Sequence, residues 1–287
     1  MGKKRVISGS STLEIEEFKL SDMVEYASIV MVAKRGSGKS YVCRSILDHF
    51  CKIPVGLIIA PTDEMNCFYG NFFPKTYIHY EYKSEILENL LTRQKIMIKK
   101  EKERKEKGGR PIDARSFVVM DDCLSTKGSW AKDKSIKQLL FDGRHYKIMY
   151  ILTMQFPLGI LPELRTNFDY IFLLADDFVS TRKKLHEHYA GMFPTLAVFV
   201  QVFEQLTADF GCMVIINRGQ RHSFSQKVMW YKAPAKFNDN LSRGCKQFND
   251  FHNKNYDPEW YDKKNGINID DIIKNKKIKV TKLEHDI

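Results

Sequence analysis

Residues 32–41 read VAKRGSGKSY and have the residue types and spacing of a phosphate-binding loop, except at one position. The pattern G-x-x-x-x-G-K-[ST] binds phosphate oxygens with backbone N–H groups at a helix N-terminus, and its lysine reaches the β- and γ-phosphates. Ala33 stands where this pattern has its first glycine, and the G-S-G-K-S part is complete. One added methyl group fits if the φ angle of Ala33 stays negative. The loop therefore predicts an ATP site.

Each part of the loop has an expected contact. Gly36 and Gly38 allow positive φ angles and a close approach of the backbone to the nucleotide. Lys39 neutralises phosphate charge as a catalytic residue, and the Ser40 hydroxyl is a ligand for Mg²⁺. The predicted nucleotide-binding residues are Ala33, Lys34, Arg35, Gly36, Ser37, Gly38, Lys39, Ser40 and Tyr41.

Two adjacent carboxylates, Asp121 and Asp122, follow the apolar residues 117–120 at the end of a predicted strand. Ligands of open α/β sheets bind at the carboxyl ends of the strands. We predict that Asp121 holds Mg²⁺ and that Asp122 orients or deprotonates the attacking water, although the two roles could be exchanged. The structural alternative is a helix cap, for Asp122 in particular.

Buried strands alternate with helices along most of the chain. Helical spacing of apolar residues predicts helices at 39–50, from 84 into the charged arm closed by Gly108 and Gly109, and at 133–145, 180–191 and 196–206. Nearly continuous apolar runs predict strands at 28–33, 55–61, 115–122, 147–155, 167–175 and 211–217, with shorter ones at 13–18, 76–80 and 230–233. This order predicts an α/β fold with a mainly parallel sheet covered by helices on both faces. The expected organisation is a lead-in at 1–27, an ATPase core at 28–217 and a basic extension at 218–287.

The chain is basic, with 46 Lys and Arg against 35 Asp and Glu, a formal charge of +11 and a pI of about 9.2. Such a balance favours a polyanionic partner, nucleic acid before membrane, although an uncommitted basic surface is the alternative. No apolar run reaches the length of a membrane span, and no apolar segment follows the basic N-terminus as in a signal peptide. We expect a soluble intracellular protein. Candidate contacts to DNA phosphates, which could equally be solvated, are Lys127, Lys132, Lys134 and Lys137, the arm 99–107 and the tail 274–282.

Three segments together carry a resemblance: AKRGSGKSYVCRSIL, the run FDGRHYKIMYILTMQFP and the shorter EHYAGMFPT. Over residues 28–217 the chain resembles the genome-packaging ATPases of nucleocytoplasmic large DNA viruses, which are similar to the FtsK/HerA DNA pumps. The resemblance implies a RecA/FtsK-HerA-like P-loop NTPase fold and a ring-shaped homo-oligomer, a pentamer or hexamer. It implies that ATP hydrolysis threads double-stranded DNA into a capsid, with capsid or portal-site proteins as partners. The place of action would be the host cytoplasm and its viral factory, or the virion.

The resemblance also suggests roles for residues outside the loop. Gln155 matches the glutamine that senses the γ-phosphate at a strand end, and Asp122 stands where the pumps usually carry glutamate. An arginine finger from a neighbouring subunit is expected, with Arg144 as the first candidate and Arg165 as the second. A finger needs a guanidinium at the carboxyl edge of the sheet. The alternatives are an ordinary surface arginine, or one that braces Asp142 or Asp169.

Three other functions are compatible with a phosphate-binding loop. A small-molecule kinase would need a lid, for which Arg182 is a candidate, but it would leave Gln155 unexplained. A terminase-type enzyme would need a nuclease domain with clustered carboxylates, and the roughly 70 residues after 217 are too few for one. A DNA-binding assembly protein without hydrolysis would keep the loop as structure only.

Overall fold

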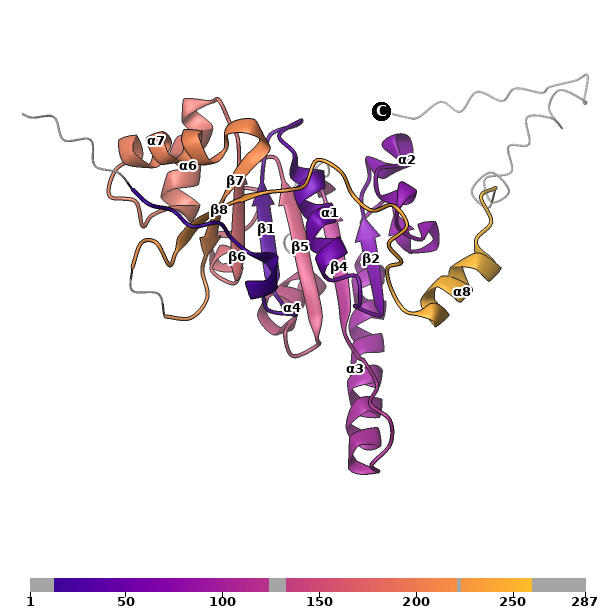
Figure 1. Cartoon of the computed structure of the whole chain (residues 1–287). Helices are drawn as coiled ribbons and strands as arrows, with labels where there is room; N and C mark the ends of the chain where they lie inside the picture. The colour runs from indigo at the N-terminus through magenta and orange to yellow at the C-terminus, as the bar shows by residue number, and fades with distance from the viewer. Residues whose placement is uncertain (1–12, 124–132, 221–222, 260–287) are drawn as a thin grey trace, which may run out of the picture.

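The computed structural model describes residues 13–123, 133–220 and 223–259 (Figure 1). In the described part, eight strands form one sheet in the order β3-β2-β4-β5-β1-β6-β7-β8. The strands are β1 (Ser28–Val32), β2 (Val55–Ile59), β3 (Ile78–His79), β4 (Ser116–Asp121), β5 (Ile148–Met154), β6 (Tyr170–Leu174), β7 (Gly211–Ile216) and β8 (Val228–Lys232). The helices are α1 (Lys39–His49), α2 (Asp63–Asn66), α3 (Ser84–Glu106), α4 (Lys134–Asp142), α5 (Pro162–Arg165), α6 (Val179–Tyr189), α7 (Leu196–Leu206) and α8 (Lys246–Asn255), with 3-10 turns at Leu20–Asp22, Tyr69–Asn71, Lys75–Tyr77 and Ala208–Phe210.

The six strands from β3 to β6 are parallel, and β7 and β8 are antiparallel to their neighbours. The prediction of a mainly parallel α/β sheet is confirmed, but the strand at 211–217 runs opposite to what strict alternation implies. The reason is the connection, because two helices, α6 and α7, follow β6 instead of one. The chain thus returns to the edge where β6 ended and re-enters the sheet from there.

The sheet also continues past the predicted core boundary at residue 217. β8 pairs with β7, so the structural core includes part of the predicted basic extension. The predicted strand at 13–18 is wrong, since this segment forms only an isolated bridge between Glu17 and Trp230. Two hydrogen bonds support the bridge: Phe18 N–H donates to the Trp230 carbonyl at 2.7 Å, and Trp230 N–H donates to that of Glu16 at 3.1 Å.

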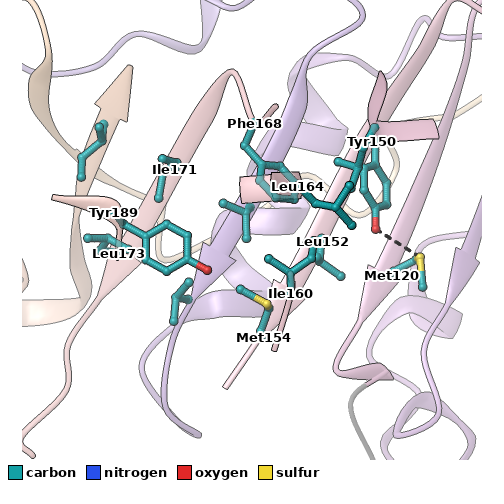
Figure 2. Packing of buried hydrophobic residues seen from close by; sticks show 14 of the residues in the cluster. Met120, Tyr150, Leu152, Met154, Ile160, Leu164, Phe168, Ile171, Leu173 and Tyr189 are labelled. Carbon is teal, nitrogen blue, oxygen red and sulfur yellow. Dashed lines mark hydrogen bonds between the residues drawn. The ribbon is translucent and has the colours of Figure 1, made fainter. Parts of the chain in front are cut away.

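Both faces of the sheet are buried, as predicted for near-continuous apolar strands. Along β1, Ile29 and Met31 pack against Val42 and other residues of α1, whereas Val30 and Val32 face the opposite side. Figure 2 shows part of that second cluster, where the Tyr150 hydroxyl meets the Met120 sulfur at 3.3 Å. Each fully buried large side chain contributes about 1.5–3 kcal/mol. This burial holds the strand ends, and the site they carry, in fixed positions.

The charged arm is a projection of α3. This helix of 23 residues extends well past the amino ends of the strands (Figure 1). It ends at Glu106, and Gly108 adopts a φ of 63°, so the predicted closure by glycines is confirmed. No helix in the described ranges is long and apolar enough to cross a membrane. Of the other basic candidates, Lys134 and Lys137 lie on α4, and Lys127, Lys132 and the tail 274–282 lie outside the described residues.

Candidate nucleotide site

The glycine loop follows β1 and leads into α1. Gly36 and Gly38 have φ angles of 77° and 96°, the left-handed region that favours glycine. The Ser37 hydroxyl donates to the Lys34 carbonyl at 2.8 Å and closes the turn. Ala33 is buried and is not among the described residues with positive φ, and its N–H donates to the Met154 carbonyl at 3.0 Å. The condition for tolerating the extra methyl group is therefore met.

The loop lies at a point in the sheet where the chain continues to opposite sides of β1: the connection after β1 leads to β2 on one side, and the connection after β5 leads to β6 on the other. β1 sits between β5 and β6, and β4 lies beyond β5, so the loop emerges beside the ends of β4 and β5. Such a point, at the carboxyl ends of parallel strands, is where open α/β sheets bind ligands. Lys39 on the first turn of α1 reaches both carboxylates: its Nζ lies 3.5 Å from Asp121 Oδ1 and 3.7 Å from Asp122 Oδ1.

The end of β5 supplies two side chains that hold these carboxylates. The Thr153 hydroxyl donates to Asp121 Oδ1 and accepts a hydrogen bond from Asp122 N–H at 3.1 Å. The Gln155 amide donates to Asp122 Oδ2. Asp122 itself has a φ of 56°, and such left-handed conformations in residues other than glycine cluster at functional sites. The structure thus brings together Lys39, Asp121 and Asp122, which were predicted from motifs, and Gln155, whose role was implied by the resemblance.

These four residues line one cavity of about 610 Å³, a size usual for small-molecule sites. Two predicted loop residues, Ala33 and Ser37, are buried and do not line it. The remaining predicted residues of the loop that line it are Lys34, Arg35, Gly36, Gly38, Ser40 and Tyr41.

Tyr69 is a lining residue that sequence reasoning missed. Its side chain is buried, and burial together with the charge of Asp121 raises the pKa of its phenol well above the usual range. The neighbouring Cys43 thiol has its pKa raised to about 12, chiefly by burial. Both groups therefore stay neutral beside the carboxylates at physiological pH. Tyr69 follows α2 in a run rich in aromatic residues, and nothing in that run marks one ring as part of a site.

Residues beyond the predicted core also line the cavity. They are the segment from Lys232 to Ala235 at the end of β8, and they are joined by Phe210, which precedes β7 and lies inside the predicted core. Because β7 is antiparallel, its first residue lies at the carboxyl edge, and β8 ends at that same edge. The sequence signal for this arrangement was the pair of consecutive helices before β7. Thr62, Asn66 and Phe68, which follow β2, complete the lining.

Arg144 and Arg165 do not meet the condition set for a finger. Each precedes a parallel strand, β5 or β6, and therefore lies toward the amino edge, away from the loop. Arg144 is exposed, and its guanidinium lies 3.8 Å from Asp169 Oδ1, which is the bracing alternative. Arg165 is buried, and its Nε donates to the Ile160 carbonyl at 3.1 Å. The expectation that one of them occupies the carboxyl edge is wrong.

The kinase-lid candidate Arg182 is engaged elsewhere. Its Nε donates to the Asp176 carbonyl at 2.6 Å, and the guanidinium pairs with Glu204. The side chain does not line the cavity. Nothing about its position favours the small-molecule kinase.

The donor set fits Mg²⁺. Ser40 offers a hydroxyl and Asp121 a carboxylate, both lining the same cavity, and these are hard oxygen ligands. Among the described residues, no group of three or more His, Cys, Asp or Glu side chains could hold a metal by itself. Mg²⁺ at nucleotide sites is usually bound by one or two protein oxygens plus substrate phosphates and water, so two donors suffice.

Comparison with known proteins identifies the family of the chain and structures that share its fold. A family model described as Poxvirus A32 protein matches residues 16–170. An uncharacterized protein of Acanthamoeba polyphaga mimivirus is 48% identical over 247 residues, covering 86% of each chain. Two solved structures share the fold: the genome packaging NTPase B204 from Sulfolobus turreted icosahedral virus 2 in complex with AMPPCP (TM-score 0.50, 15% identity, 74% of this chain and 100% of that one), and the pCW3 conjugation coupling protein TcpA with ATPgS (TM-score 0.52, 14% identity, 73% and 60%). With this fold, this site and these relatives, the chain belongs to the viral Poxvirus A32 protein family.

Proposed function

We propose that this protein is a viral genome-packaging ATPase, which hydrolyses ATP to move double-stranded DNA into a capsid. The observation that carries the proposal is the convergence of Lys39, Asp121, Asp122 and Gln155 on one cavity beside a glycine loop. Membership of the A32 family supports it. So does the likeness in fold to B204, a genome packaging NTPase whose complex holds AMPPCP, an analogue of ATP.

Nucleotide binding would use the loop and α1. N–H groups around Gly36 and Gly38 surround the phosphate oxygens, and the positive end of the α1 dipole adds to the attraction. In the structure, the Lys39 ammonium lies near Asp121 and Asp122. When ATP is bound, its phosphates would lie between the ammonium and these carboxylates and contact the ammonium. Ser40 and Asp121 would hold Mg²⁺, which, when bound, neutralises charge on the β- and γ-phosphates.

Hydrolysis would use the second carboxylate. A water on the γ-phosphate side is oriented by Asp122, which accepts its proton as the water oxygen bonds to the γ-phosphorus. The bond between that phosphorus and the bridging oxygen breaks, and ADP leaves with this oxygen. Gln155 fixes Oδ2 of Asp122, and Oδ1, which faces Lys39 at 3.7 Å, would orient the water once Lys39 turns to the phosphates. Gln155 lines the same cavity, and its amide would sense a γ-phosphate bound there.

DNA transport requires binding that does not depend on the base sequence, and such binding is made through contacts to the phosphates. The net charge of +11 supplies the attraction, and the described candidates are Lys134 and Lys137 on α4 together with the basic residues of the α3 arm. We extend the proposal to a ring of five or six copies that surrounds the duplex and works with capsid or portal-site proteins. The finger in such a ring would come from an arginine other than Arg144 and Arg165.

The test is ATP turnover with Mg²⁺, measured with and without long duplex DNA. We expect turnover in both conditions, stimulation by DNA, and DNA binding that weakens steeply as salt rises. Lys39→Ala should abolish turnover, whereas Lys99→Ala on the distant α3 arm should leave basal turnover unchanged. Turnover that persists in Lys39→Ala would reject the site. Consumption of a small phosphate acceptor would point to the kinase, and binding of DNA without any turnover would point to an assembly protein.

A further inference from the structure

The cavity has a second flank that the hydrolytic chemistry does not use. Asp121, Asp122 and Gln155 end β4 and β5, on one side of β1. Phe210 and Lys232 belong to the ends of β7 and β8, on the other side of β1, and they line the same cavity. A triphosphate whose γ-phosphate faces the carboxylates therefore has the rest of the nucleotide directed away from them, toward this second flank.

Phe210 is held in an unusual conformation on that flank. Its φ is 62° and that of the preceding Asp209 is 49°, a pair of left-handed residues of which neither is glycine. Each such conformation costs about 1–3 kcal/mol and persists where the surroundings over-determine it. The Phe210 side chain is nevertheless 65% exposed, and in the described ranges its ring contacts no other aromatic ring. Strain that presents an apolar ring to solvent beside a ligand cavity indicates a binding surface.

The ring lies directly against the phosphate loop. A Cβ atom built on Gly38 would lie 3.6 Å from both Cβ and Cδ1 of Phe210. The Phe210 side chain therefore lies next to the backbone of Gly38. The ring is thus next to the phosphates that the loop is proposed to bind, on the side away from Asp121 and Asp122.

A strap, defined here as residues 233–239, borders the same flank of the cavity. It leaves the end of β8 and crosses α1, as Figure 1 shows. The Phe237 ring contacts Tyr41 at 5.5 Å between centroids and lies 4.5 Å from the Arg44 guanidinium, which also pairs with Asp239. These contacts tie the strap to α1. Its residues from Ala233 to Ala235 line the cavity with small apolar side chains.

We propose that Phe210 and the strap form the slot for the nucleobase of the bound nucleotide, with the base stacked on the Phe210 ring. The proposal rests on nucleotide binding at the proposed ATPase site and assigns its base-recognising end. Stacking on an aromatic ring recognises the flat face shared by all bases. The small strap residues line the same cavity as the ring and would pack against the base there.

The experiment compares two ligands that share phosphates and differ in the base. Binding of Mg-ATP and of inorganic tripolyphosphate is measured by calorimetry for wild type, Phe210→Ala and Phe178→Ala. Phe178 is the matched control, because it is an exposed phenylalanine that does not line the cavity. We expect Phe210→Ala to weaken ATP binding by about 5- to 100-fold and to leave tripolyphosphate binding unchanged. Phe210→Trp should restore ATP binding, and Phe178→Ala should behave as wild type.

The outcomes separate this inference from the proposed function. If wild type binds ATP and tripolyphosphate but Phe210→Ala loses neither, the base slot is overturned while the ATPase site stands. If Phe210→Ala loses both ligands equally, the ring supports the loop and does not bind the base. If wild type binds neither ligand, the proposed function itself fails. Phe210→Leu keeps apolar volume without an aromatic face and gives the same test should the alanine variant fold poorly.

Discussion

The side-chain amide of Gln155 donates a hydrogen bond to Oδ2 of Asp122, and this contact joins the ends of β5 and β4. The other oxygen of the same carboxylate faces Lys39 at 3.7 Å. Asp122 is thus held from two sides, at a backbone angle that few aspartates adopt. A carboxylate fixed in this way loses little entropy when it orients a water, which is the property that a general base requires.

Replacing the carboxylate by an amide tests this role. Asp122→Asn keeps the shape but cannot accept a proton, so we expect the hydrolysis rate to fall by about 10²- to 10⁴-fold while ATP binding is retained. Steady-state turnover and calorimetric affinity measure the two effects separately. Asp142→Asn, at the end of α4, is the matched control and should leave both unchanged. An equal loss of affinity and turnover in Asp122→Asn would contradict the assignment.

Thr153 positions both carboxylates through one hydroxyl. Thr153→Val is nearly isosteric but leaves Asp122 N–H without its acceptor and Asp121 without its donor. We expect a loss of about 1–3 kcal/mol in the free energy of unfolding, together with a lower turnover. Thr153→Ser keeps the hydroxyl and should recover turnover even if stability stays reduced. Chemical denaturation and turnover assays give the comparison, and full activity in the valine variant would show that the hydroxyl is dispensable.

Ala33 is predicted to be a stabilising departure from the usual loop. Since its φ does not need the freedom of glycine, Ala33→Gly should reduce the unfolding free energy by about 1 kcal/mol, because the unfolded chain gains entropy and a buried methyl group is lost. ATP affinity should change by less than about twofold. Denaturation curves and calorimetry measure both quantities. Tighter ATP binding in the glycine variant would mean that the methyl group obstructs the loop.

Stability should fall as the pH decreases below neutrality. Burial lowers the pKa of His79, and burial together with the charge of Lys75 lowers that of His252, below the usual value near 6.5. The unfolded chain then binds protons that the folded protein does not, so the unfolding free energy decreases as the pH falls through about 6.5, by at most about 1.4 kcal/mol per pH unit per histidine.

The measurement is denaturation at several pH values between 5 and 8. His79→Gln and His252→Gln should each flatten the decrease, and the exposed His145→Gln should keep the wild-type slope. A wild-type slope in both the His79 and the His252 variant would assign the pH dependence to other groups.

Local patterns located the phosphate loop and the aspartate pair, because each is defined by a few consecutive residues next to a strand, whereas Gln155 was assigned from the resemblance to the FtsK/HerA pumps. The residues that depend on non-local pairing were missed. Phe210 and Lys232 reach the cavity only because β7 and β8 run antiparallel, and that follows from how two helices return the chain to one edge. Arg144 and Arg165 were candidates for the finger, but each precedes a parallel strand and therefore lies toward the amino edge, where Arg144 is near Asp169, the bracing alternative.

The borders of the sheet restrict how copies of this chain can associate. At one border β3 has only two residues, and at the other the backbone of residues 16–18 occupies hydrogen-bonding groups of β8 at Trp230. Short or covered borders of this kind resist strand-to-strand aggregation. Within the residues that the structure describes, neighbouring copies therefore find no long row of free N–H and C=O groups to extend, so contacts between these parts of two copies would have to be made by side chains.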